Sequence, residues 1–202
     1  KDGLVTCGSV IKLKHKDTGH HLHSHAVAWG SGSSQQSVTA HGASNDQQSF
    51  WLVKEAHNAE ACPLSTAIKC GDKIRLQHVA TGKNLHSHLF RAPLSGNQEV
   101  SGFGDNGWGD TGDNWEVVCS SKADYWNRGE VIQFKHGDTG KWLSTGTAYA
   151  FNQQNCGGGC PIMGQTEVSS SSKKDSKTLW FTGQGIYFPG SDSHSSPLDD
   201  EL

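Results

Sequence analysis

The stretch IKLKHKDTGHHLHSH, residues 11–25, recurs twice along the chain, as IRLQHVATGKNLHSH (74–88) and as IQFKHGDTGKWLSTG (132–146). In each copy two apolar residues and a histidine occupy every second position, Thr-Gly follows, and a leucine stands seven positions beyond the histidine. This alternation is typical of a strand with one buried face, and glycine permits the positive φ of a tight turn. Each copy therefore predicts a β-hairpin. The recurring residues are His15, Thr18, Gly19, Leu22, His78, Thr81, Gly82, Leu85, His136, Thr139, Gly140 and Leu143.

Two further patterns complete each repeat. The first pattern predicts a third strand and occurs as QSVT (36–39), QEVS (98–101) and TEVS (166–169). The second pattern is a tryptophan near the end of each repeat, which predicts a closing strand with a large buried ring: Trp51, Trp115 and Trp180. A unit of four strands cannot bury its own apolar face, so three units must share one core. We expect an all-β protein, a β-trefoil of about twelve strands with pseudo-threefold symmetry. The predicted domain spans residues 1–190, with repeats at about 1–66, 67–124 and 125–190, and a flexible polar tail at 191–202.

Composition narrows the class of protein further. The chain has 202 residues, 18% of them charged, and a net charge of −3, which is unlike the basic surface of a nucleic-acid-binding protein. Apolar runs such as FWLV (50–53) are far shorter than the roughly 20 residues of a membrane helix. Twenty-five glycines and the lack of long helical periodicity agree with short strands and turns. We expect a soluble monomer without nucleic-acid partners or membrane insertion.

Six cysteines without paired C-x-x-C spacing favour disulfides over a thiolate metal site. If the first and last strands of a repeat pair antiparallel, the cysteines just outside them come together. This predicts Cys70–Cys119 and, by analogy, Cys7–Cys62, while Cys156 and Cys160 flank a short GGG loop that permits a third bridge. Fifteen pairings remain formally open. Disulfides imply an oxidising compartment, so we expect that a signal peptide has been removed or omitted ahead of Lys1.

The last four residues resemble a retrieval signal. Asp199, Asp200, Glu201 and Leu202 are similar to the K/H-D-E-L signal of proteins resident in the endoplasmic reticulum, with Asp in place of the usual Lys or His. We therefore expect the protein in the lumen of the endoplasmic reticulum, with retrieval weakened by the first residue.

The H-x-x-T-G-x-x-L motif, the Q/T-x-V-T/S step and the terminal Trp resemble the MIR repeat, which protein O-mannosyltransferases share with inositol trisphosphate and ryanodine receptors. Three such repeats with a retrieval-like tail are similar to the stromal cell-derived factor 2 family. The resemblance implies a lumenal β-trefoil that joins chaperone complexes, with an Hsp40-type co-chaperone and an Hsp70 as partners, and that helps keep misfolded client proteins soluble.

The histidines fall into two groups. Alternation places His21, His23 and His25 on one face of a strand, a set of the kind that holds zinc. No acidic residue except Asp17 lies nearby in the sequence to orient the rings, so this set is a weak candidate and we expect no metal site. A pH-responsive surface is the alternative. All three repeats keep His15, His78 and His136, so we interpret these rings as structural hydrogen-bonding groups of the turn. No cofactor is expected.

The sequence holds no catalytic motif of the G-x-S-x-G, phosphate-loop or H-E-x-x-H type, so we expect no enzymatic activity. A lectin-like binder of mannose-type glycans is the alternative function. The segment FGDNGWGDTGDNW (103–115) has the aromatic and polar residues of a sugar site, although a polar, glycine-rich loop explains the same composition. The candidate glycan or partner contacts are Asp105, Trp108, Asp110 and Asn114. An insertion at 152–165 in the third repeat offers another partner contact.

Overall fold

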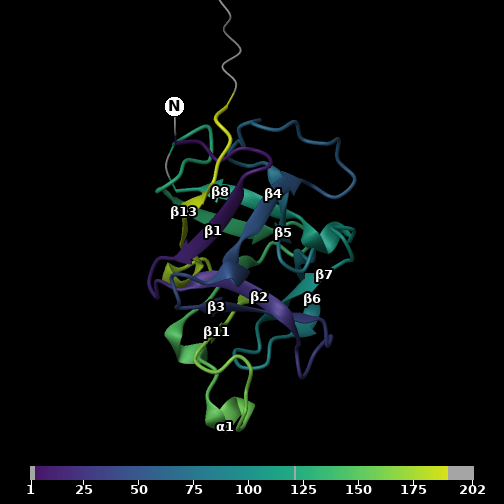
Figure 1. Cartoon of the computed structure of the whole chain (residues 1–202), viewed down its shortest axis with the longest axis vertical. Coiled ribbons are helices and arrows are strands. Elements are labelled where there is room, and N and C mark those ends of the chain that lie inside the picture. The colour runs from purple at the N-terminus through teal and green to yellow at the C-terminus, as the bar shows by residue number, and fades with distance from the viewer. Residues whose placement is uncertain (1–2, 121, 191–202) are drawn as a thin grey trace, which may run out of the picture.

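The computed structural model describes residues 3–120 and 122–190, in which three similar four-stranded units surround one core (Figure 1). The first repeat contains β1 (Val10–His15), β2 (His21–Ala28), β3 (Gln36–His41) and β4 (Trp51–Glu55). The second contains β5 (Lys73–His78), β6 (Asn84–Arg91), β7 (Gln98–Phe103) and β8 (Trp115–Cys119). The third contains β9 (Val131–His136), β10 (Trp142–Ser144), β11 (Thr166–Glu167), β12 (Ser169–Ser171) and β13 (Trp180–Ile186). The helical turns are η1 (Gln47–Ser49), η2 (Thr111–Asp113), η3 (Thr147–Tyr149), η4 (Ser176–Thr178) and α1 (Gln153–Cys156).

The first and last strands of the three repeats close into a six-stranded antiparallel barrel, in the order β1, β4, β5, β8, β9, β13 and back to β1. The middle strands form a second ring, in which β3 pairs with β7, β7 with β12, and β11 with β3. A barrel capped at one end by three hairpins is the β-trefoil that the repeats predict. The register repeats as well: Ile11 faces Trp51, Ile74 faces Trp115, and Ile132 faces Trp180.

Thirteen strands replace the expected twelve within the described residues, because the third strand of the last repeat is split at Val168. Its first part, β11, pairs with β3, and its second part, β12, pairs with β7. The corresponding strands β3 and β7 each pair with three neighbouring strands but stay continuous. The thirteenth strand therefore arises from an interruption of one trefoil strand and is not an additional element.

The core is built on the three closing tryptophans. Trp51, Trp115 and Trp180 are fully buried, and each indole Nε1 donates a hydrogen bond of 3.0 Å to the carbonyl oxygen of the motif leucine of its own repeat. A buried indole N–H without a partner would destabilise the fold, so this bond sets the distance between the closing strand and the hairpin. The three leucines, Leu22, Leu85 and Leu143, are themselves fully buried.

The recurring histidines join each repeat to a neighbouring one around the barrel. In each ring Nδ1 faces the hydroxyl of the turn threonine at 2.8–3.0 Å, and Nε2–H donates to a backbone carbonyl of that neighbouring repeat at 2.8–2.9 Å. The carbonyls belong to Lys177, Gln48 and Gly112 for His15, His78 and His136 respectively. Burial lowers the pKa of all three imidazoles, although the bond to the carbonyl opposes the shift. The rings therefore act as neutral clamps, and the contact across repeats is a feature that the turn motif alone did not predict.

The structure joins the same three cysteine pairs that the sequence predicts. Cys7–Cys62 and Cys70–Cys119 pack against the barrel core, and the two Cα–Cα distances are 6.1 and 5.7 Å. The third pair, Cys156–Cys160, packs instead against a small second cluster formed by Trp29, Phe151 and Ile162. The candidate retrieval signal, Asp199 to Leu202, lies outside the described residues. In the described part of the chain, no helix is long and apolar enough to cross a membrane.

Candidate functional site

A chain of hydrogen bonds runs from one buried carboxylate to another in the second repeat. Asp113 Oδ1 lies 2.8 Å from His86 Nδ1, His86 Nε2 lies 3.3 Å from His88 Nδ1, and His88 Nε2 lies 2.9 Å from Glu99 Oε1. The alternation of β6 places both rings on the same face, η2 supplies Asp113, and β7 supplies Glu99. His86, Asp113 and Glu99 are almost completely buried, whereas His88 is half-buried.

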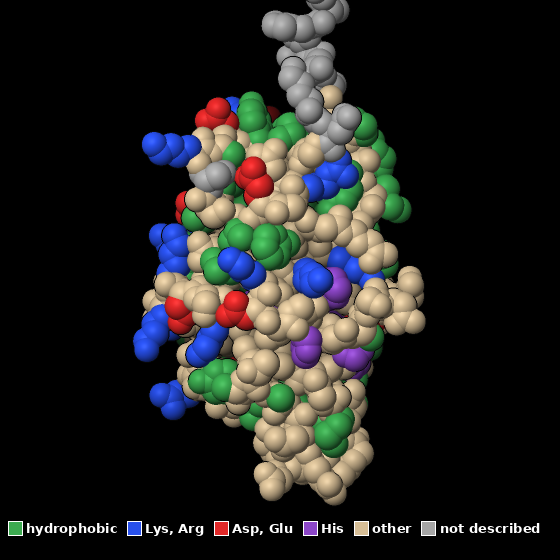
Figure 2. All heavy atoms as spheres, turned by 90° about the vertical axis from the view of Figure 1, so that its left-hand side faces the viewer, with side chains coloured by type: hydrophobic (Ala, Val, Ile, Leu, Met, Phe, Trp, Pro, Cys, Tyr) green, Lys and Arg blue, Asp and Glu red, His purple; other side chains and the backbone are tan. Residues whose placement is uncertain are grey.

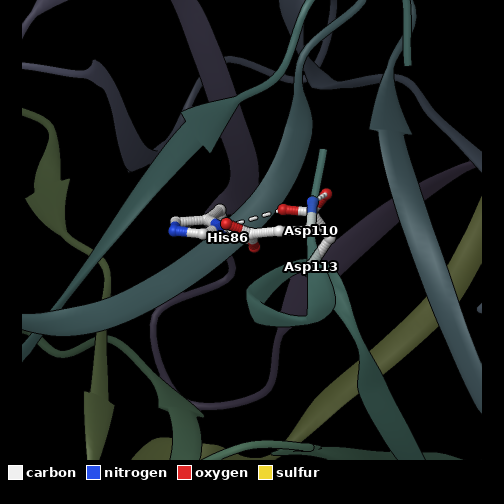
Figure 3. Close-up of side chains that lie close together, drawn as sticks. All are labelled: His86, Asp110 and Asp113. Atoms are coloured by element: carbon white, nitrogen blue, oxygen red, sulfur yellow. Dashed lines mark hydrogen bonds and ion pairs between the residues drawn. The ribbon is translucent and has the colours of Figure 1, made fainter. Parts of the chain in front are cut away.

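His86 Nδ1 also faces a second carboxylate (Figure 3). Asp110 Oδ1 lies 3.5 Å from this nitrogen, and the three ligand-type atoms of His86, Asp110 and Asp113 lie within 4.8 Å of one another. Asp110 is exposed and caps η2 by accepting a bond from the Gly112 amide at 2.8 Å. The other oxygen of Asp113 accepts bonds from Asn84 Nδ2 at 3.0 Å and from the Asp110 amide at 3.1 Å. Both carboxylates are therefore held in place before any ligand arrives.

Two glycines make this close packing possible. A Cβ atom at Gly109 would lie 1.8 Å from Asp113 Oδ2, and one at Gly112 would lie 2.5 Å from His86 Cε1. Either side chain would displace a member of the cluster, since van der Waals contact needs more than 3 Å. The glycines of the 103–115 loop thus have a role beyond the turn chemistry that the sequence indicated.

The first repeat holds a shorter version of the chain, and it corrects the expectation that no acidic residue orients these rings. His23 Nδ1 bonds Asp46, and His23 Nε2 lies 2.8 Å from His25 Nδ1. An acidic residue therefore does orient these rings, but it lies 23 residues away. The set His21, His23 and His25 is not assembled as a metal site, because both ring nitrogens of His23 are occupied and His21 takes no part in this chain. Among the described residues the one group with metal-ligand spacing is that of the second repeat.

The pKa values of His23 and Asp46 in the first repeat are set by burial and by hydrogen bonds. Burial lowers the pKa of His23, although the bond to Asp46 opposes the shift. Burial also disfavours the charged form of Asp46, but hydrogen bonds from Ser49, Gln48 and His23 outweigh it, so the pKa of Asp46 is lowered. The pair thus consists of a carboxylate and a ring held mainly neutral. The third repeat has Ser144 and Gly146 at the equivalent positions and so lacks the imidazoles altogether.

The four candidate glycan contacts do not converge on one hollow. Trp108 is 75% exposed and borders a hollow of about 340 Å³ with Arg75 and Glu55, whereas Asp110 faces His86. The other two candidates bond elsewhere: Asp105 pairs with Lys83 at 2.6 Å, and the Asn114 side chain accepts a bond from the His57 amide at 2.8 Å.

The loop that carries Trp108 is anchored through one carbonyl. Gly107 O accepts bonds from Lys54, Arg75 and Asn84 at 3.0–3.2 Å. Burial, together with the neighbouring Arg75, lowers the pKa of Lys54 to about 8. The exposed indole therefore stands on a rigid support, which limits the conformational cost of any contact that it makes.

The loop segments at the hairpin end of the trefoil contain no charged residue, a feature that the sequence reasoning missed. Three segments meet there, residues 26–35, 92–97 and 145–165, and none contains Asp, Glu, Lys or Arg. The lower end of Figure 2, around α1, accordingly shows neither acidic nor basic side chains. The signal was present in the sequence as a charge-free run of more than twenty residues, but it becomes a surface only when the three segments are brought together.

An apolar hollow of about 410 Å³ opens at this end. Trp29 and Phe151 pack against each other in its wall, with 5.8 Å between ring centroids, and Ala28, Pro93 and Ile162 are among the other lining residues. Glu99 and Glu167, both buried, tie the neighbouring loops down by accepting bonds from the Ser33 amide and from the amides of Leu94 and Ser95. The surface that we call the uncharged end therefore has a fixed shape. Three large apolar side chains are exposed on β6 and on the 145–165 segment: Leu89, Phe90 and Met163.

Comparison with known proteins agrees with this architecture. Residues 28–154 match the MIR domain. The human protein "Stromal cell-derived factor 2" is 46% identical over 191 residues, which cover 94% of this chain and 85% of that protein. The crystal structure of the SDF2-like protein from Arabidopsis thaliana superposes with a TM-score of 0.86 at 38% identity, covering 94% of this chain and 99% of that one.

A more distant likeness covers only part of the other protein. In the S. cerevisiae protein O-mannosyltransferase Pmt1-Pmt2 complex bound to the sugar donor, 26% of one chain matches 93% of this chain, with a TM-score of 0.76 and 26% identity. Identity above 40% over nearly the whole length, together with the MIR match and the shared trefoil, establishes the relationship. The chain belongs to the stromal cell-derived factor 2 family.

Proposed function

We propose that this chain is a non-enzymatic protein of the endoplasmic reticulum lumen that binds misfolded client proteins as a cofactor of an Hsp70 and an Hsp40-type co-chaperone. Membership of the stromal cell-derived factor 2 family supports the proposal. Three disulfides suit an oxidising compartment, and the final residues Asp199 to Leu202 suit retrieval.

The uncharged end is the observation that carries the client-binding part of the proposal. Unfolded segments differ in sequence but share exposed apolar side chains, so a surface that binds many of them gains affinity chiefly from apolar burial, about 25 cal/mol per Å². A charged group in such a surface would lose water without a fixed counter-charge on the client. The hollow lined by Trp29 and Phe151 has apolar walls, and the three converging segments contribute no ionised group.

A binding experiment tests this assignment. The probe is a fluorescein-labelled, uncharged peptide of alternating aromatic and aliphatic residues, and the readout is anisotropy. Ala28→Glu and Met163→Glu, both at exposed positions on the uncharged end, should each weaken binding about tenfold, which corresponds to about 1.4 kcal/mol. Ile186→Glu, at an exposed apolar position on the barrel, is the matched control and should bind as the parent does. Equal loss in all three variants would contradict a localised client surface.

The partner assignment needs a separate measurement. The purified chain is passed over an immobilised lumenal Hsp40-type co-chaperone, over a lumenal Hsp70, and over an array of mannose-type glycans. Retention by the co-chaperone, unchanged in Ala28→Glu, supports a cofactor whose client and partner surfaces differ. Retention on mannose glycans without retention on either chaperone would overturn the proposal.

Glycan binding remains a second candidate because of Trp108. An exposed indole on a rigid loop, beside a hollow that also holds Asn58 and Asn106, is the type of platform on which sugar rings stack. If this candidate holds, Trp108→Ala abolishes retention on the glycan array, while Phe90→Ala, which removes another exposed aromatic ring, leaves it unchanged.

A further inference from the structure

The hydrogen-bond chain of the second repeat places two imidazole rings between two carboxylates. Carboxylates only accept, so Asp113 requires a hydrogen on His86 Nδ1 and Glu99 requires one on His88 Nε2. A neutral imidazole carries a single N–H, so His86 Nε2 and His88 Nδ1 would then face each other across 3.3 Å with a lone pair on each and no hydrogen between them. One added positive charge, a proton on either ring or a metal ion beside one of them, would remove this contact between lone pairs.

A metal ion at the Asp113 end supplies that charge and completes the chain. When the ion takes His86 Nδ1, the ring hydrogen moves to Nε2 and is donated to His88 Nδ1. His88 then donates its own hydrogen from Nε2 to Glu99. Both rings are neutral, and every position between the ion and Glu99 holds one hydrogen. A carboxylate that orients a metal-binding histidine is a common arrangement around zinc, here with a second imidazole inserted between the two.

We propose that His86, Asp110 and Asp113 form a binding site for a divalent transition-metal ion, with zinc the expected occupant. The ligand atoms would be His86 Nδ1 and one Oδ1 from each aspartate, with present separations from Nδ1 of 2.8 Å to Asp113 and 3.5 Å to Asp110 (Figure 3). Zinc binds nitrogen and oxygen ligands at about 2.0–2.2 Å, so the distances between its ligand atoms are similar to these separations. The site borders a hollow of about 460 Å³, so a water molecule has room as the fourth ligand.

The first repeat serves as an internal comparison. Its chain runs from Asp46 through His23 to His25, without a carboxylate at the far end. Two neutral rings then satisfy every bond, since His25 donates to His23 and His23 donates to Asp46. Ser49 also stands where the second repeat has Asp113, so one ligand is missing. The geometry assigns the metal to the second repeat alone, and all six cysteines are held in disulfides and do not compete for it.

Zinc titration of the full chain with its disulfides intact tests the proposal. We expect one equivalent of Zn²⁺ with a Kd below about 10 μM by calorimetry, and intense visible absorption typical of tetrahedral coordination when Co²⁺ is used instead. Asp110→Asn keeps an N-cap residue at η2 and should weaken binding at least about tenfold, as should Glu99→Gln through the orienting bond. Asp138→Asn, a carboxylate that lines the same hollow without facing His86 Nδ1, is the matched control.

Zinc binding by the parent and by these variants distinguishes the proposed site from other histidines. Loss of zinc binding in His86→Gln and Asp110→Asn, with Asp138→Asn unchanged, supports the site. Equal zinc binding by the parent and His86→Gln would place the ion on other histidines and overturn it, as would the absence of bound zinc. Tighter binding of Ca²⁺ than of Zn²⁺ would overturn the choice of a transition metal. Because His86→Gln alters a buried position, its thermal unfolding is recorded beside that of Asp110→Asn, whose exposed side chain tests the site without a core change.

Discussion

Lowering the pH from about 7.5 to about 5.5 should destabilise the trefoil through the buried clamp histidines, and His78 shows the effect most simply. Its ring is fully buried, Nε2 donates to Gln48 O at 2.8 Å, and burial lowers its pKa from the ordinary imidazole value of 6.5. In the unfolded chain the same imidazole is free to take a proton. Its contribution is therefore complete above pH 6.5 and is lost as the pH falls from there toward the lower pKa of the folded state.

The loss of stability between the two pH values has an upper limit. If the folded ring stays neutral throughout, protonation of the unfolded chain over this pH interval lowers the free energy of unfolding by about 1.4 kcal/mol for one histidine. His15 and His136 make the same contacts, and the pKa of each is also lowered by burial, so the three together contribute at most about 4 kcal/mol.

Urea unfolding followed by tryptophan fluorescence at the two pH values measures this effect. In His78→Gln a carboxamide still donates to the Gln48 carbonyl but does not titrate. We expect the variant to be about 1–3 kcal/mol less stable at the higher pH, because packing against Trp51 is lost, and its difference between the two pH values to be smaller by up to about 1.4 kcal/mol. His57→Gln is the control. A His78→Gln variant that keeps the full pH dependence of the parent would contradict a role for this ring.

Three further predictions concern stability. Leu85→Ala, at a fully buried position of the barrel core, should lower the free energy of unfolding by about 3 kcal/mol, measured from the urea midpoint. Replacing Cys7 and Cys62 by serine should cost about 4 kcal/mol, since this bridge closes a loop with a sequence separation of 55. The same change at Cys156 and Cys160, with a separation of 4, should cost about 2 kcal/mol, and calorimetric unfolding that ranks the two bridges in the opposite order would contradict the loop-entropy argument.

The sequence by itself determined the elements and their assembly. Period-two alternation depends on neighbouring residues, as does the Thr-Gly turn, so the hairpins were predictable position by position. Three copies of a unit that cannot bury its own face require a common core. Antiparallel pairing of the first and last strands then brings together Cys70 and Cys119, which the structure joins. The split of the last repeat at Val168 was not predictable, because the TEVS motif has the same spacing as its counterparts.

Only the tertiary structure decided which chemical groups meet. His23 and His86 lie on predicted strands, but their carboxylate partners come from turns 23 and 27 residues away. Conversely, Trp108 and Asp110 are near neighbours in the sequence yet face different hollows. The uncharged end likewise exists only where three separate segments converge. The physical reason is that local patterns set the direction of a side chain relative to its own strand, whereas contacts between distant segments are set by closure of the barrel, which brings the turn of one element over the face of another.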